Sequence, residues 1–94
     1  MDHLLNLETI LSSGCRRKIL RILLLKRKSN VMELVQQTNS TYNQVNSNLK
    51  ILEKEGIIID AHVGYKRVIS LNTTNPRIFR ASQVLKLLSK SEDR

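Results

Sequence analysis

The stretch that decides the fold is residues 30–56, which read NVMELVQQTNSTYNQVNSNLKILEKEG. Asn30 followed three residues later by Glu33 resembles the capping box that begins a helix, so we expect a helix over residues 31–37. The next three residues, Thr-Asn-Ser, form a tight turn. Asn39 stands in this turn where a left-handed backbone is wanted, and asparagine tolerates that conformation better than most residues.

A longer helix is expected over residues 41–55. Gly56 follows at the position where helices commonly end in a left-handed residue. At 100° per residue the apolar side chains of this helix fall on one side, which we expect to face the core. These side chains are Tyr42, Val45, Leu49 and Leu52.

The opposite side of this helix is polar, and no acidic residue occurs between Glu33 and Glu53. Asn and Gln can pair bidentately with adenine edges, Ser can read a donor or an acceptor, and Lys neutralises phosphate. Two helices joined by a three-residue turn form a helix-turn-helix, whose second helix lies in the major groove of DNA. The predicted DNA-binding side chains are Thr41, Asn43, Gln44, Ser47, Asn48, Lys50 and Lys54.

Two further helices precede this unit. Leu4, Leu7 and Leu11 recur at helical spacing and predict a first short helix over residues 2–11. Ser13 is a suitable N-cap for a second helix over residues 15–27, which is apolar on most sides and is expected to be central and buried.

A β-hairpin is expected after Gly56. Three consecutive isoleucines, residues 57–59, and a second apolar run from Val68 to Leu71 flank a turn that contains Gly64. Lys66 and Arg67 lie at the tip of this hairpin, where they are predicted to reach backbone phosphate or an adjacent minor groove. The alternative is a solvated turn that is basic only for solubility.

The chain is expected to end in a helix that begins near Pro76, because proline suits the first helical turn. Its apolar spacing resembles a short coiled-coil seam and predicts a homodimer; the alternative is that this helix folds back on its own domain. The predicted interface side chains are Leu4, Leu7, Leu11, Ile78, Ala81, Leu85 and Leu88. The expected fold is mainly α with a small β-hairpin, a winged helix-turn-helix of order α-α-α-α-β-β-α, with a DNA-binding domain over residues 1–74 and a dimerisation helix over residues 75–94.

The composition agrees with a nucleic-acid partner. The 94 residues include 16 Lys and Arg against 8 Asp and Glu, a formal net charge of +8, which favours a polyanion such as nucleic acid or, second, an anionic membrane surface. No apolar run approaches the roughly 18 residues of a membrane span. A single cysteine cannot form an internal disulfide, so we expect a soluble, cytoplasmic protein.

Enzymatic and metal-binding functions find little support. The chain has no glycine-rich phosphate loop, no paired carboxylates and no nucleophile near a histidine in sequence, so we expect no enzyme and no cofactor. His3, Cys15 and His62 are too isolated for a closed zinc site, and no metal site is predicted. Redox sensing through Cys15 is a minor hypothesis, because a helix N-terminus and neighbouring arginines lower a thiol pKa.

The run Leu11 to Leu20, with Glu33-Leu34, Leu49 to Glu53, Gly56-Ile57 and Tyr65 to Leu71, resembles the ArsR-type winged-helix regulators over about four-fifths of the chain. The resemblance implies DNA contacts at Asn43, Gln44, Ser47 and Asn48, wing contacts at Lys66 and Arg67, and a homodimer built by the terminal helices.

The sequence departs from that family at two places. Thr38 and Ser40 stand where apolar residues are usual, so the turn packs loosely or Tyr42 fills the gap. Residues 31–35 read VMELV where metal-sensing members carry cysteines, and no small-molecule effector is identified. The alternative function is a winged-helix subunit that binds proteins in a larger transcription or assembly complex.

Overall fold

The computed structural model describes residues 12–92, except for the side chains of residues 81, 84–85 and 88–92. The expected helix over residues 2–11 lies outside the described residues. The elements are α2 (Gly14–Lys26), β1 (Lys28–Ser29), α3 (Val31–Thr38), α4 (Tyr42–Lys54), β2 (Ile58–Val63), β3 (Lys66–Leu71) and α5 (Arg77–Glu92).

Each of the first three described helices begins at a side chain that accepts a hydrogen bond from the first helical turn. Ser13 accepts from the backbone N of Arg16, and Asn30 accepts from the backbone N of Glu33 at 2.9 Å. Thr41 and Gln44 form a complete capping box. The predicted caps at Ser13 and Asn30 are therefore confirmed, because capping depends on residues close in sequence.

The sheet contains a strand that the expected element order lacked. β1 has two residues and pairs antiparallel with β3, Lys28 opposite Ser70 and Ser29 opposite Ile69, so the strand order is β1-β3-β2. The sequence analysis expected only a connection between the helices over residues 15–27 and 31–37. A two-residue strand has no alternating pattern to detect, and its partner lies about 40 residues further along the chain.

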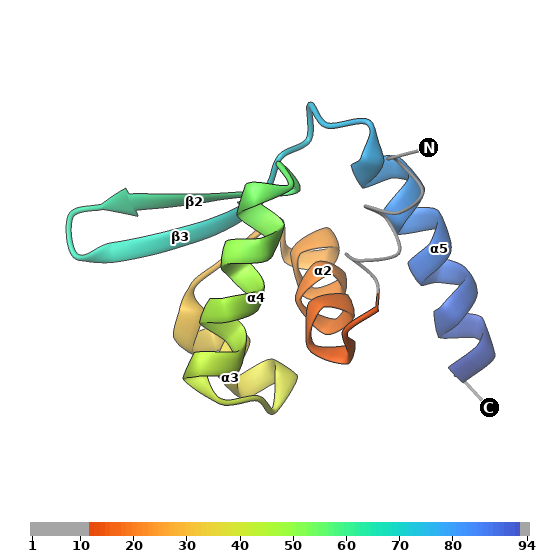
Figure 1. Cartoon of the computed structure of the whole chain (residues 1–94), viewed down its shortest axis with the longest axis horizontal. Coiled ribbons are helices and arrows are strands. Elements are labelled where there is room, and N and C mark those ends of the chain that lie inside the picture. The colour runs from red at the N-terminus through yellow and green to blue at the C-terminus, as the bar shows by residue number, and fades with distance from the viewer. Residues whose placement is uncertain (1–11, 93–94) are drawn as a thin grey trace.

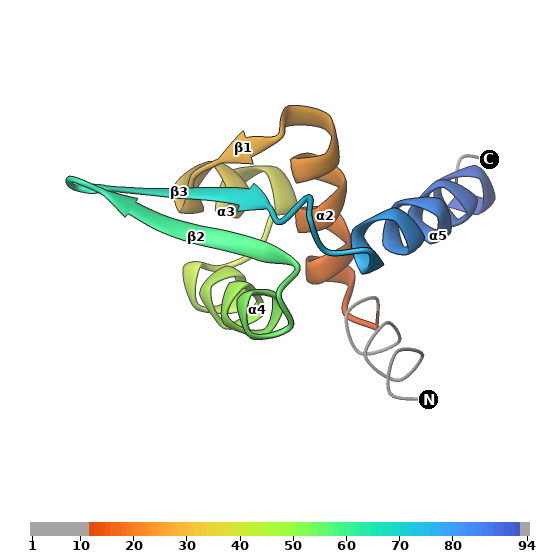
Figure 2. The same cartoon turned by 90° about the horizontal axis from the view of Figure 1, so that it is seen from above.

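The core lies between α2 and the elements packed around it (Figures 1 and 2). Its buried apolar side chains are Ile19, Leu20, Leu23, Val31, Leu34, Val45, Leu49, Leu52, Ile57, Ile58 and Ile69. The prediction that Tyr42 faces this core is wrong, because its side chain is 47% exposed. Thr38 is buried instead, and its hydroxyl donates to the Leu34 carbonyl at 2.6 Å, so a polar residue occupies this position without an unpaired group.

Hydrogen bonds and an ion pair link the residues that follow α4 to the residues at the start of α5. Gly56 has a φ of +74°, and its carbonyl accepts from the Asn72 and Asn75 side chains at 3.0 and 2.9 Å. Arg77 forms an ion pair with Glu55 at 2.9 Å. These bonds fix the beginning of α5 to the end of α4.

Figure 1 shows the hairpin β2–β3, hereafter the wing, reaching past α4 on one side of the molecule while α5 stands on the opposite side. Helices α3 and α4 form the helix-turn-helix, and Asn39 between them has φ 55° and ψ 41°, the left-handed conformation predicted for it. The molecule is a winged helix-turn-helix, as the sequence predicted. No helix within residues 12–92 has the length and apolarity needed to cross a membrane.

Candidate nucleic-acid interface

The outward side of α4 is exposed along its whole length. Six of the seven predicted contact residues on this helix are exposed, and Asn48 is half-buried. In the described part of the chain, no bond engages the side chains of Asn43, Ser47 or Lys50. These side chains project from adjacent turns of α4 and are available to a ligand.

The first turn of α4 is fixed by its own cap. The backbone N of Thr41 donates to Gln44 Oε1 at 2.9 Å, and the backbone N of Gln44 donates to Thr41 Oγ1 at 3.1 Å. This turn contains no acidic residue. The partial positive charge at the helix start is therefore not cancelled locally, which suits an approaching phosphate.

Asn48 ties α4 to α2. Its Oδ1 accepts from Arg16 Nε at 2.8 Å, and its Nδ2 donates to the Gln44 carbonyl at 2.7 Å. Both ends of the Asn48 amide thus have partners within the chain. Sequence reasoning did not pair Arg16 with Asn48, because residues 32 positions apart give no local signal of contact.

The wing tip is a tight turn that exposes two side chains. Gly64 takes a φ of +64° while Tyr65 keeps an ordinary negative φ, the combination of a type II′ turn with glycine first. Tyr65 is fully exposed, and Lys66 is exposed beside it. Lys66 lies where the sequence predicted a basic wing contact.

Arg67 lies in a different environment from Lys66. Its Nε and Nη2 donate to the two carboxylate oxygens of Asp60 at 3.2 and 2.5 Å. Its Nη1 donates to Asn46 Oδ1 at 3.2 Å and to the Tyr42 hydroxyl at 3.4 Å. The hydrogen bond to the Asp60 carboxylate raises the pKa of Arg67. Sequence reasoning missed Asp60, Asn46 and Tyr42 as partners of this arginine.

The acid nearest the start of the helix-turn-helix is neutralised within the chain. Glu33 accepts from Lys26 Nζ and from Ser29 Oγ, each at 2.6 Å. These two hydrogen bonds, Lys26 first, lower the pKa of Glu33. The carboxylate is thus a paired charge that adds little repulsion toward a polyanion.

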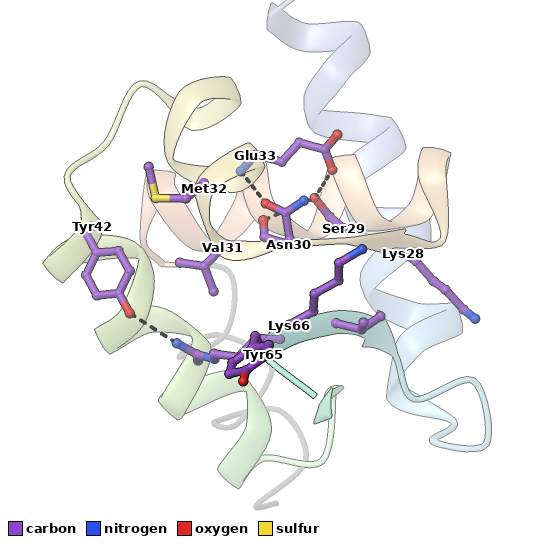
Figure 3. Close-up of a pocket in the computed structure, with 11 residues that line it drawn as sticks. Lys28, Ser29, Asn30, Val31, Met32, Glu33, Tyr42, Tyr65 and Lys66 are labelled. Atoms are coloured by element: carbon purple, nitrogen blue, oxygen red, sulfur yellow. Dashed lines mark hydrogen bonds between the residues drawn. The ribbon is translucent and has the colours of Figure 1, made fainter. Parts of the chain in front are cut away.

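A shallow groove of about 550 Å³ lies between the wing, β1 and the start of α3 (Figure 3). Met32, Tyr42 and Tyr65 give it apolar surface, and Lys28 and Lys66 give it positive charge. Residues 12–92 contain no group of three His, Cys, Asp or Glu side chains that could hold a metal ion.

The predicted dimer residues are described only in part. Leu4, Leu7 and Leu11 lie outside the described residues, and the side chains of Ala81, Leu85 and Leu88 on α5 are also outside them. Ile78 is half-buried and packs against the core of its own chain. Phe79 and Leu87 on α5 are each 67% exposed and were not singled out by the sequence pattern.

No protein-family model matches the sequence, and no curated protein is significantly similar to it. Solved structures do match. The AntR antimony-specific transcriptional repressor has a TM-score of 0.78 and 20% identity, with 97% of this chain and 81% of that chain covered. A transcriptional regulator homologue from Pyrococcus horikoshii OT3 has a TM-score of 0.73 and 21% identity, with both chains fully covered.

A third match is described as the homodimeric winged helix-turn-helix DNA-binding domain of Mb0332 from Mycobacterium bovis, a possible ArsR-family transcriptional regulator. Its TM-score is 0.67 at 16% identity, and 98% of this chain and 80% of that chain are covered. At such identities the likeness concerns the fold, and at that level it confirms the resemblance seen in the sequence. This chain has the winged helix-turn-helix fold of the ArsR-family transcriptional regulators.

Proposed function

We propose that this protein is a transcriptional regulator that binds double-stranded DNA as a homodimer, with α4 in the major groove and the wing on adjacent backbone or minor groove. One observation carries the proposal: the exposed side of α4 presents amides, hydroxyls and lysines from Thr41 to Lys54 without an acidic residue before Glu53. Matches to solved transcriptional repressors and regulators support it.

The chemistry of this surface changes along the helix. Asn43 and Ser47 project near the start of α4, where hydrogen-bonding groups can read base edges. Lys50 and Lys54 follow on the same side, where their ammonium groups can neutralise phosphate. A surface built to dock a protein would be apolar or acidic instead, so the face favours DNA over the protein-binding alternative.

Self-association is the second part of the proposal. Phe79 and Leu87 leave apolar surface on α5, at the far side of the molecule from the wing (Figure 2). Burial of this surface against a second copy would leave both α4 helices free. The homodimeric match supports this arrangement. No catalytic role is part of the proposal, and the solved structures that match are of transcriptional regulators.

The test is selection of bound duplexes from a random pool, followed by titration of the enriched duplex at several salt concentrations. We expect one pseudo-palindrome with half-sites about one helical turn apart. Log affinity should fall linearly with log salt, with a slope of about 0.9 per phosphate contacted.

The contribution of α4 is tested with Lys50→Gln, which should reduce that slope by about one phosphate contact. The matched control is Lys18→Gln, which removes an exposed lysine of α2, outside α4, the wing and α5, and should leave the slope unchanged. An unenriched pool, or an affinity independent of salt, would overturn the proposal.

A further inference from the structure

Arg67 lies on the side of the wing that faces the helices. In the β2–β3 register Asp60 is opposite Ile69, and Arg67 is two residues from Ile69 on β3, so all three side chains share one face. Ile69 is completely buried. The side chains of Asp60 and Arg67 are 9% and 23% exposed. This ion pair therefore lies next to the core and is largely covered by the protein.

The guanidinium joins two elements of the candidate interface. One edge makes the two hydrogen bonds to Asp60 on the wing, and Nη1 reaches Asn46 and Tyr42 on α4. Asn46 and Tyr42 are four residues apart and therefore lie one above the other on the same side of α4. The hydrogen bond that Arg67 donates to the Tyr42 hydroxyl is the dashed line at Tyr42 in Figure 3.

These bonds engage four of the five N–H donors of the Arg67 guanidinium, so a full phosphate contact by Arg67 would have to replace some of them. Removal of the arginine would leave the Asp60 carboxylate largely covered and without its cation, which is costly. It would also leave a negative charge beneath a wing that approaches DNA. Bidentate arginine–carboxylate pairs are geometrically specific. The pair with Asp60 therefore fixes the orientation of the Arg67 guanidinium as well as its distance from the carboxylate.

We propose that Arg67 is a positioning residue, which with Asp60 holds the wing at a fixed angle to α4 and makes no contact with DNA itself. This inference rests on the proposed DNA-binding function. Its consequence is that Lys66 and the polar side of α4 are presented at a set spacing before DNA arrives. Preorganisation of this kind raises affinity, because the ordering cost is met during folding.

Asp60→Asn distinguishes a positioning role of Arg67 from a phosphate contact, because the two roles predict opposite changes in duplex affinity. If Arg67 positions the wing, loss of the carboxylate frees the wing and weakens duplex binding by about tenfold. If Arg67 contacts phosphate, the same change removes a competitor and a negative charge, and binding becomes tighter or stays the same.

The experiment titrates the enriched duplex with the full chain in the wild-type form and in three variants. Glu53→Gln is the matched control, because it removes one exposed carboxylate from α4 and should leave affinity equal or slightly tighter. Asn46→Ala keeps the ion pair intact and removes the shorter of the two hydrogen bonds from Arg67 to α4, so it should weaken binding by about threefold. Asn46→Ala also keeps the inference testable if Asp60→Asn fails to fold.

A second measurement needs no DNA. Backbone relaxation by NMR should show greater mobility of residues 60–67 in Asp60→Asn than in wild type or Glu53→Gln. Weaker binding with a more mobile wing supports the inference, and tighter or unchanged binding by Asp60→Asn overturns it. If wild type binds no duplex, the proposed function fails, and the NMR mobility of the wing alone tests the positioning role. A wing that is as rigid in Asp60→Asn and Asn46→Ala as in wild type overturns that role.

Discussion

Asn39 sets the geometry of the turn between α3 and α4. Its φ of 55° and ψ of 41° are left-handed, and its backbone N donates to the Gln36 carbonyl at 3.3 Å. The next residue, Ser40, donates its backbone N to the Val35 carbonyl at 3.2 Å. These bonds satisfy carbonyls at the end of α3 and direct the chain into the cap of α4.

Asn39→Ala should therefore lower the free energy of unfolding by about 1 kcal/mol, because a β-carbon without the asparagine amide disfavours the left-handed region. Asn39→Gly should be nearly neutral. Urea denaturation followed by circular dichroism measures both changes. Gln37→Ala, at an exposed helical position, is the control and should change stability little. Equal stability of the alanine and glycine variants would contradict this role of Asn39.

Residues whose conformation depends on near neighbours were predictable, and those with distant partners were not. Asn39, Ser13 and Asn30 are examples of the first kind, since turns and caps depend on a few adjacent residues. Tyr42 is an example of the second. Helical spacing aligns Tyr42 with Val45 and Leu49, but the wing supplies a polar partner for its hydroxyl, and the ring remains at the surface.

At the scale of elements, the junction of α2, β1 and α3 depends on one carboxylate. Glu33 on α3 binds Lys26 at the end of α2 and Ser29 in β1, each at 2.6 Å. The sequence predicted Glu33 only as a capping residue of its own helix. Its second partner, Ser29, lies in β1, whose pairing with β3 has no local signal in the sequence.

The stability contributed by this junction should depend on pH. The pKa of Glu33 in the folded chain is below its ordinary value of 4.5, so the stabilisation is complete above 4.5 and is lost as pH falls through the folded pKa. We expect Glu33→Gln to be less stable than wild type at pH 7, with a difference that shrinks below pH 4.5. Urea denaturation at a series of pH values measures this difference.

Lys26→Met serves as the companion variant for the junction, because it removes the donor that lowers the pKa of Glu33 most. In that background the effect of Glu33→Gln should be smaller and less dependent on pH. A difference between wild type and Glu33→Gln that stays constant from pH 7 to pH 3 would contradict the assignment. High salt should reduce the stability difference between wild type and Glu33→Gln, since the Lys26 and Glu33 side chains are 39% and 33% exposed.

Across the whole molecule, the wing and α5 lie at opposite sides, with α4 between them in the view of Figure 1. The pattern in α5 predicted an apolar helix but could not distinguish the side that meets its own domain. Ile78 is such a position, since it packs against the core. Phe79 and Leu87 are exposed instead, so they are better probes of self-association than Ile78, whose substitution would also disturb folding.

The double variant Phe79→Glu, Leu87→Glu should therefore fold normally but sediment with the mass of one chain, because it places charge on the apolar surface of α5. On a palindromic duplex it should bind each half-site independently and more weakly, because the linkage between the two sites is lost. Leu25→Glu is the control: Leu25 is 86% exposed on α2, and its substitution should leave the mass of the dimer unchanged. If the double variant keeps the mass and the affinity of wild type, the two copies do not meet through this part of α5.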